Sequence, residues 1–165
     1  MTKEELLDRI SPCGLVCYTC PGFIHGAIKE HSEALLTLHK GFREFLDKQL
    51  PDEYRYVLAE HDKYIEKLQK DASPSCLGCR KIDGKAPACI KGCFIPTCTK
   101  EHSVDFCGVC DEFPCSKIEE SDIFGKEAKQ GFYEGSLLIK EHGAEMFFEM
   151  KKDISHYINY AKVHK

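Results

Sequence analysis

The part of the sequence that decides the fold reads CGVCDEFPC and spans residues 107–115. It contains a Cys-x2-Cys pair, in which a short turn brings two thiolates within reach of one metal ion at about 2.3 Å. The same gap separates Cys17 from Cys20 and Cys76 from Cys79. This repeated spacing predicts metal-binding turns, two of which complete one tetrahedral site.

The surrounding segment, residues 73–115, is interrupted by proline and glycine and shows no helical periodicity. Eight of the eleven cysteines lie in it. Such a segment does not fold by apolar burial alone, and metal crosslinks would supply what the core lacks. We therefore expect an embedded metal-knuckle segment at 73–115 within a single domain, 1–165. Positive residues in this segment would offset thiolate charge: Arg80, Lys81, Lys85, Lys91 and Lys100.

All of the cysteines are candidate metal ligands: Cys13, Cys17, Cys20, Cys76, Cys79, Cys89, Cys93, Cys98, Cys107, Cys110 and Cys115. Two four-thiolate zinc sites use eight of the eleven, so we expect about two zinc ions per chain. How the cysteines divide between the sites stays open. If a histidine joins, His102 follows Cys98 at an accepted zinc spacing, and His25 is the second candidate.

The first cysteine loop, Cys13-x3-Cys17-x2-Cys20, supplies three donors, and any fourth cysteine must come from residues 73–115. Its spacing also matches the motif of radical S-adenosylmethionine enzymes. An iron–sulfur redox or radical-type enzyme is therefore the alternative function, and a thiol sensor or metal buffer is another. Closed four-thiolate sites leave no position for water, so they favour structural zinc that shapes a surface for a partner or ligand. The residues assign no reaction and lean against an enzyme.

The regions outside the cysteine segments have helical periodicity. Apolar residues at alternating steps of three and four predict one long helix, or two collinear ones, over about residues 22–49, which Pro51 ends. Asp52 is expected to cap a second helix over 53–70, giving a helical hairpin at 22–70. We expect the stripe of the first helix to face a core, and a coiled coil is the alternative that its heptad-like spacing leaves open.

Further helices are expected at both ends of the chain. A capping box formed by Thr2 and Glu5 begins a helix over residues 3–10. In the last third, the pattern predicts a helix over 134–142, which Gly143 ends, and another over 144–161. The expected fold is mostly α: a helical hairpin plus C-terminal helices around a loop-rich cysteine metal-knuckle region.

Charge and hydropathy exclude several classes of protein. The 165 residues carry 23 basic and 27 acidic side chains, and no basic block indicates nucleic-acid binding. No run approaches the roughly 18 apolar residues of a membrane span. The first ten residues mix both charges, which argues against a secretory leader and for a cytoplasmic location, where disulfides are rare. An unidentified protein partner stays open.

Several stretches together resemble a known family. They read CGLVCYTCPGF at 13–23, CLGC at 76–79, CFIPTC at 93–98 and CGVCDEFPC at 107–115, and LIKEHGAE at 138–145 is similar to the closing helices of the family. This is an uncharacterised family of cysteine-rich bacterial and archaeal proteins, catalogued as a domain of unknown function. The resemblance implies a cytoplasmic, zinc-binding protein without an assigned reaction, and it supports all eleven cysteines as family-type positions.

Overall fold

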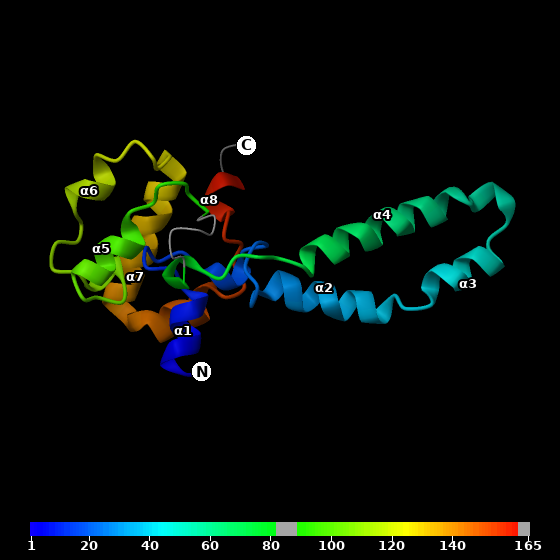
Figure 1. Cartoon of the computed structure of the whole chain (residues 1–165), viewed down its shortest axis with the longest axis horizontal. Helices are drawn as coiled ribbons and strands as arrows, with labels where there is room; N and C mark the ends of the chain where they lie inside the picture. Colours follow the sequence, from blue (N-terminus) through cyan, green and yellow to red (C-terminus); the bar gives the residue numbers. More distant parts are fainter. Residues whose placement is uncertain (82–88, 162–165) are drawn as a thin grey trace.

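The structure is a computed structural model that describes residues 1–81 and 89–161. Figure 1 shows two parts, a body that contains the N-terminus and the last described helix, and a helical arm that projects from it. The arm is residues 27–71, and the body is the remainder of the described chain. The helices are α1 (Lys3–Arg9), α2 (Ala27–Leu38), α3 (Phe42–Gln49), α4 (Tyr56–Asp71), α5 (Ile95–Glu101), α6 (Ser116–Glu119), α7 (Lys126–Lys151) and α8 (Ile158–Ala161).

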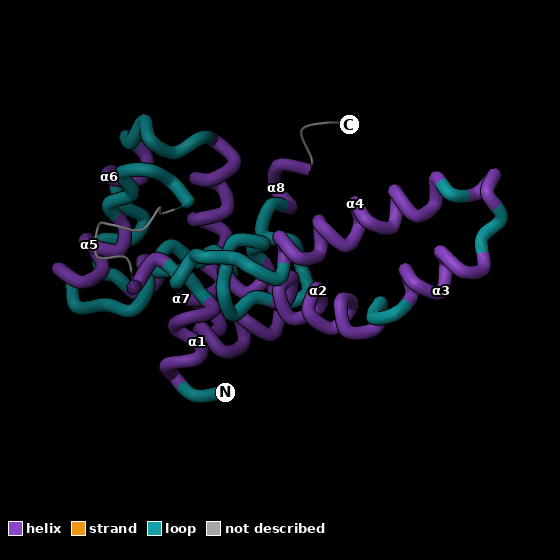
Figure 2. The backbone as a smooth tube through the Cα atoms, turned by 45° about the vertical axis from the view of Figure 1, so that its right-hand side comes forward, coloured by secondary structure: helices purple, strands orange, loops and turns teal. Residues whose placement is uncertain are grey.

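The mostly helical fold expected from the sequence is confirmed. The described ranges contain isolated β-bridges but no strand. Figure 2 shows that the loops are concentrated in the body, whereas the arm is almost entirely helical. The predicted capping box of α1 is present, because the Thr2 hydroxyl accepts from the Glu5 N–H at 3.2 Å and the Glu5 carboxylate accepts from the Thr2 N–H at 2.7 Å. None of the helices in these ranges is long and apolar enough to cross a membrane.

The arm is an antiparallel hairpin in which α2 and α3 run outward and α4 returns (Figure 1). The outward half consists of two helices because Gly41 adopts the left-handed conformation, φ 82°, that ends α2 before α3 begins. The first of them starts at Ala27 rather than at residue 22, since residues 22–26 form turns beside the cysteine loops.

The start of α4 differs from the prediction. Asp52 does not cap the helix; it lies in a 3-10 turn, Asp52–Tyr54, and its carboxylate accepts from Arg55 Nε at 2.9 Å. The helix begins at Tyr56 without a side-chain cap.

The expected core stripe of the arm is largely exposed. Leu46, Leu58 and Leu68 are the buried apolar residues of α3 and α4. The outer part of the predicted stripe is exposed instead, and so are three tyrosines of the arm. The exposed residues are Leu35, Leu38, Phe42, Phe45, Tyr54, Tyr56 and Tyr64. Two helices cover each other on one side only, so the remaining faces of the arm meet solvent.

The body is built around α7, which packs against two apolar clusters. One contains Ile95, Phe113, Ile118, Phe124 and Phe132, together with Cys13, Cys107 and Ala128. The other joins α1 to the second half of α7 through Leu6, Ile10, Val16, Phe106, Ile139, Phe147 and Phe148. The helix that organises the body therefore also covers the cysteine loops.

Two glycines allow α7 to touch these loops with its backbone. A Cβ added to Gly135 would lie 2.2 Å from the carbonyl oxygen of Gly14, and one added to Gly108 would lie 2.1 Å from that of Ser136. No side chain fits at such distances, so both positions require glycine. The helix begins at Lys126, well before the expected residue 134, and Gly135 lies inside it because it serves this close packing.

The C-terminal prediction is correct at one point and wrong at another. Gly143 does interrupt the helix, with φ 79° and ψ 160°. However, the second segment ends at Lys151 rather than at residue 161, because the chain turns there and brings His156 back to the first cysteine loop. The structure also contains α5 inside residues 73–115, where no helix was expected; its Pro96 stands in the first turn, where proline is tolerated.

Candidate functional site

The first cysteine loop is a compact hairpin. Ile10 and Val16 form an antiparallel bridge, and between them Ser11 N–H donates to the Leu15 carbonyl at 2.8 Å. The Ser11 hydroxyl lies 3.0 Å from Cys13 Sγ. Residues Cys17–Thr19 then make a 3-10 turn that places Cys17 and Cys20 at its two ends. This is the knuckle that the Cys-x2-Cys spacing predicts.

The second Cys-x2-Cys loop lies directly beside the first. Phe23 pairs with Cys76 in a parallel bridge, and Cys76 N–H donates to the Gly22 carbonyl at 2.9 Å. A Cβ on Gly22 would lie 3.8 Å from Cys20 Sγ and 3.9 Å from Cys76 Cβ. The backbone therefore ties together two cysteine pairs that the whole arm separates in the sequence.

Seven cysteines share this region, and we call them the first cysteine group: Cys13, Cys17, Cys20, Cys76, Cys79, Cys89 and Cys93. Burial raises the pKa of the Cys17 thiol, and Cys13, Cys20, Cys89 and Cys76 raise it further through their charge. Burial also raises the pKa of Cys13 to about 12, with smaller contributions from Cys93 and Cys89. The sulfurs therefore lie near enough to influence one another.

Cys89 differs from its neighbours. The hydrogen bond that Cys79 donates to it lowers the pKa of Cys89 to about 6, while the same bond and burial raise the pKa of Cys79. Cys89 is also exposed, whereas Cys13 and Cys17 are buried. The pKa of Cys89 is thus shifted in the opposite direction from those of the buried thiols Cys13 and Cys17.

Arg80 supplies a half-buried positive charge beside the first cysteine group. Its Nε donates to the Leu7 carbonyl at 3.0 Å, and its guanidinium carbon lies 4.8 Å from the centre of the Phe106 ring. Burial lowers the pKa of Arg80, and Asp105, Cys17, Cys13 and Cys79 oppose this. Its Nη2 is buried without a hydrogen-bond partner among the described residues. A cation of this kind is stabilised by nearby negative charge.

Four further cysteines form a second cysteine group, Cys98, Cys107, Cys110 and Cys115. They line one cavity of about 20 Å³. Residues Cys107–Val109 repeat the 3-10 turn of the first knuckle, and Cys110 N–H donates to the Cys107 carbonyl at 3.0 Å. Cys98 comes from α5, and Cys115 directly precedes α6. A cavity of this volume has room for about one water-sized species.

Burial is also the largest cause of the pKa shifts of Cys98 and Cys107 in the second group. It raises the pKa of Cys107 to about 12, and neighbouring sulfurs add to this effect. Burial likewise raises the pKa of Cys98. The two groups adjoin, since Cys107 N–H donates to the Pro12 carbonyl at 2.8 Å and Cys13 shares an apolar cluster with Cys107.

The two histidines considered as ligands occupy different places. His102 lines the second-group cavity, with Nε2 4.0 Å from Glu112 Oε2. His25 is exposed, and its ring centre lies 5.8 Å from that of Phe23. Among the positive residues expected near the thiolates, Arg80 is in place, Lys81 pairs with Asp8 at 2.6 Å, and Lys85 lies outside the described residues.

Two C-terminal residues that contact this region were not predicted from the sequence. Tyr157 places its hydroxyl 3.6 Å from Cys20 Sγ, and His156 Nδ1 lies 2.9 Å from the Val16 carbonyl. Burial lowers the pKa of His156, which keeps its ring neutral. Both residues lie in the turn after α7. They reach the first cysteine loop because the chain folds back toward it there.

The donor set is appropriate for a thiolate-bound metal, although the side chains are not arranged around one point. All eleven cysteines are free thiols. Within residues 1–81 and 89–161, no three His, Cys, Asp or Glu side chains lie close enough together to hold a metal ion as they stand. The unpartnered Arg80 Nη2 and the four-cysteine cavity nevertheless match the charge and the donors of such a site.

A family model described as a protein of unknown function, DUF3795, matches residues 9–120. The chain belongs to the DUF3795 family. The match covers every cysteine and the whole arm, and it confirms the expected assignment to an uncharacterised family. It ends before α7, so the stretch at 138–145 that entered the resemblance lies outside it. No curated protein and no solved structure matches the chain.

Proposed function

We propose that this DUF3795 protein is a cytoplasmic zinc-binding protein, in which two thiolate sites fix the loops of the body and so shape a surface for a protein partner or ligand. The observation that carries the proposal is the cavity of about 20 Å³ lined by Cys98, Cys107, Cys110 and Cys115. Four cysteines from a helix, a knuckle and a loop line one small volume, and four is the ligand number of structural zinc.

The first cysteine group supports a second site. Cys17 with Cys20 and Cys76 with Cys79 are two Cys-x2-Cys pairs held side by side by the Phe23–Cys76 bridge. Four thiolates around Zn²⁺ carry a net charge of −2, and Arg80 would offset part of it. This assignment leaves three cysteines in surplus, Cys13, Cys89 and Cys93.

The space in the second group favours a single ion over an iron–sulfur cluster. The cavity that its four cysteines line is about the size of one water molecule. A bound zinc ion would crosslink cysteine loops that are distant from one another in the sequence. Because four thiolates complete its coordination, the ion would have no open position for substrate, so the expected role is structural.

Elemental analysis of full-length protein purified without air tests the proposal. We expect about two zinc ions per chain and no visible absorbance. Cys110→Ser and Cys20→Ser should each lose one ion, because they belong to different sites. Val109→Ala changes an exposed residue of the same turn as Cys110 and serves as the matched control, which should keep both ions.

Three results would overturn the proposal. Iron with a brown colour would favour the iron–sulfur alternative at the first cysteine loop. Absence of bound metal, with eleven titratable thiols, would favour a thiol sensor. Retention of both ions in Cys110→Ser would remove the second-group site.

A further inference from the structure

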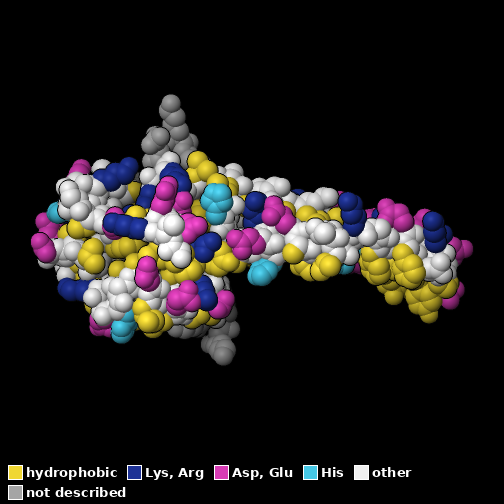
Figure 3. Space-filling view, turned by 90° about the horizontal axis from the view of Figure 1, so that it is seen from below, with side chains coloured by type: hydrophobic (Ala, Val, Ile, Leu, Met, Phe, Trp, Pro, Cys, Tyr) yellow, Lys and Arg dark blue, Asp and Glu magenta, His cyan; other side chains and the backbone are white. Residues whose placement is uncertain are grey.

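The arm carries an exposed apolar face that nothing in the described chain covers. Figure 3 shows hydrophobic side chains gathered over α3, with a further group over α2, on one side of the arm. Leu35, Leu38, Phe42 and Phe45 are between 36% and 78% exposed. The rings of Phe42 and Phe45 stack with their centres 6.1 Å apart and 17° between their planes. This face is larger and more ordered than scattered surface hydrophobics.

The spacing of these residues is that of a helix-packing stripe. Leu35, Leu38, Phe42 and Phe45 follow one another at steps of three, four and three, and the pattern continues across the turn at Gly41. Residues repeated in this way on a helix pack against another helix. Within the arm, α4 supplies Leu58 and Leu68 to the interior and covers the stripe only in part: the ring centre of its His61 lies 5.5 Å from that of Phe42, which stays 42% exposed. The outer side of the stripe therefore lacks a helical partner.

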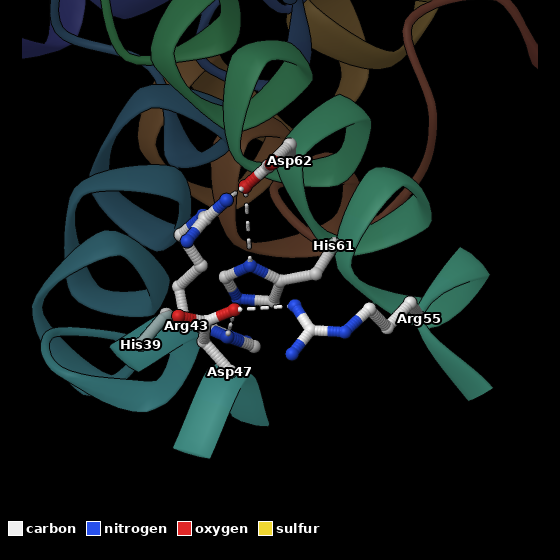
Figure 4. A network of polar contacts seen from close by, with 6 residues as sticks. All are labelled: His39, Arg43, Asp47, Arg55, His61 and Asp62. Atoms are coloured by element: carbon white, nitrogen blue, oxygen red, sulfur yellow. Dashed lines mark hydrogen bonds and ion pairs between the residues drawn. The ribbon is translucent and has the colours of Figure 1, made fainter. Parts of the chain in front are cut away.

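Two arginines beside the stripe are paired with aspartates of the same chain (Figure 4). Arg43 Nε lies 3.0 Å from Asp62 Oδ1, and Arg55 Nη1 lies 3.1 Å from Asp47 Oδ1. Behind them, His39 Nδ1 lies 3.3 Å from Nε2 of His61, whose side chain is 8% exposed. No field of a single sign surrounds the face, so a nucleic acid or an anionic membrane gains little there. An apolar partner with balanced charge fits it better.

We propose that a second copy of this chain binds to the face, so that two arms form a four-helix bundle in a two-fold symmetric dimer. In such a dimer, the patch of one chain contacts the same patch of the other chain. A stripe of similar apolar residues is compatible with this arrangement. Two helices that cannot bury their apolar residues alone become a stable bundle when a second pair covers them.

The area of the face matches this occupant. At roughly 200 Å² for each fully exposed side chain, the four stripe residues and Tyr64 expose about 500 Å². Homodimer interfaces are about 65% apolar, so this corresponds to about 800 Å² per partner, the size of a standard stable interface. Tyr64 belongs to the same region, since its ring centre lies 5.3 Å from that of His39.

Sedimentation equilibrium of the full-length protein, at up to about 100 µM, tests the dimer. We expect the wild type to dimerise. Phe45→Glu places like charges near each other across the two-fold axis and should raise the dissociation constant at least about 100-fold. Leu38→Gln, at the most exposed of these positions, should raise it about tenfold without disturbing the arm. Ile123→Glu, at a similarly exposed apolar position in the body, is the matched control and should dimerise normally.

Circular dichroism must show unchanged helix content in each variant. A wild type that stays monomeric at about 100 µM would overturn the proposal. So would a dimer that both Phe45→Glu and Leu38→Gln leave intact, or a monomer that co-sediments with uncharged phosphatidylcholine vesicles through this face. Metal content is read separately, so these outcomes do not depend on the zinc sites.

Discussion

The body and the arm are stabilised in different ways. The body has two apolar clusters, eleven thiols and direct backbone contact between α7 and the cysteine loops. The arm has no cysteine, and α3 and α4 bury only Leu46, Leu58 and Leu68 among their large apolar residues. Loops in the body depend on contacts between residues distant in the sequence, whereas the hairpin depends on neighbouring helices. Metal removal, a change of pH or a substitution should therefore affect the stability of the body and of the arm to different extents.

Removal of metal should give the largest difference between them. Structural zinc sites contribute about 10–16 kcal/mol of apparent binding free energy, so chelation under reducing conditions should remove amide protection from residues 11–22 and 107–115. The helices of the arm, α2 and α4, should keep theirs. Hydrogen exchange followed by mass spectrometry measures both, and re-addition of zinc is the control. Simultaneous loss of protection in the arm would show one cooperative unit.

Lowering the pH should weaken the body through the same sites. Burial raises the pKa of Cys98 and brings that of Cys107 to about 12, so both thiols are protonated at pH 7 without metal. Zinc must displace these protons. For each displaced proton, the zinc affinity falls about tenfold when the pH is lowered by one unit. We expect a slope of at least about two in log affinity between pH 6 and 8. Competition with a zinc-binding dye measures it, and a flat profile would contradict proton-coupled loading.

Gly135→Ala should destabilise the body whether or not metal is bound. The added Cβ would lie 2.2 Å from the Gly14 carbonyl oxygen, so α7 must move away from the first cysteine loop. Such overpacking costs about 3 kcal/mol, measurable by urea unfolding. Gly125→Ala is the control, since its Cβ would meet only a flexible Glu127 carboxylate at 3.7 Å, and it should cost less than about 1 kcal/mol. Equal effects of the two would argue against the close contact.

Leu58→Ala should act on the arm alone. Leu58 is 8% exposed and lies in α4, and its truncation should cost about 2 kcal/mol because the open sides of the hairpin let it relax. Hydrogen exchange should show faster opening of α2 and α4, with metal content unchanged. Lys63→Ala, on the exposed side of the same helix, should have almost no effect. Loss of zinc from Leu58→Ala would show that the two parts are coupled.

The sequence predicted best what depends on local spacing. The Cys-x2-Cys pairs at 17–20 and 107–110 form the same 3-10 turn, the capping box of α1 is present, and Gly143 interrupts the last long helix. Separation of the cysteines into groups of seven and four could not be predicted, because it depends on the Phe23–Cys76 bridge and on α5. A stripe of apolar residues predicts a helix face, but it does not say whether the covering helix belongs to the same chain.

The early start of α7 was missed for a related reason. Glycine normally argues against the interior of a helix, yet Gly131 and Gly135 lie inside α7, where Gly135 permits backbone contact with the first cysteine loop. His156 and Arg80 lie beside the cysteine groups because of tertiary contacts, and these contacts cannot be predicted from the spacing of residues in the sequence.

The contact between Gly14 and Gly135 also determines when the first cysteine loop can be completed during synthesis. About 120 residues separate the two glycines, and at ribosomal speeds of about 5–20 residues per second that interval lasts roughly ten seconds. The arm lies between them and needs only local contacts, so its hairpin can close on the nascent chain. The N-terminal thiols, by contrast, stay uncovered until α7 emerges. We therefore expect metal to be loaded after translation, into a chain whose arm has already folded.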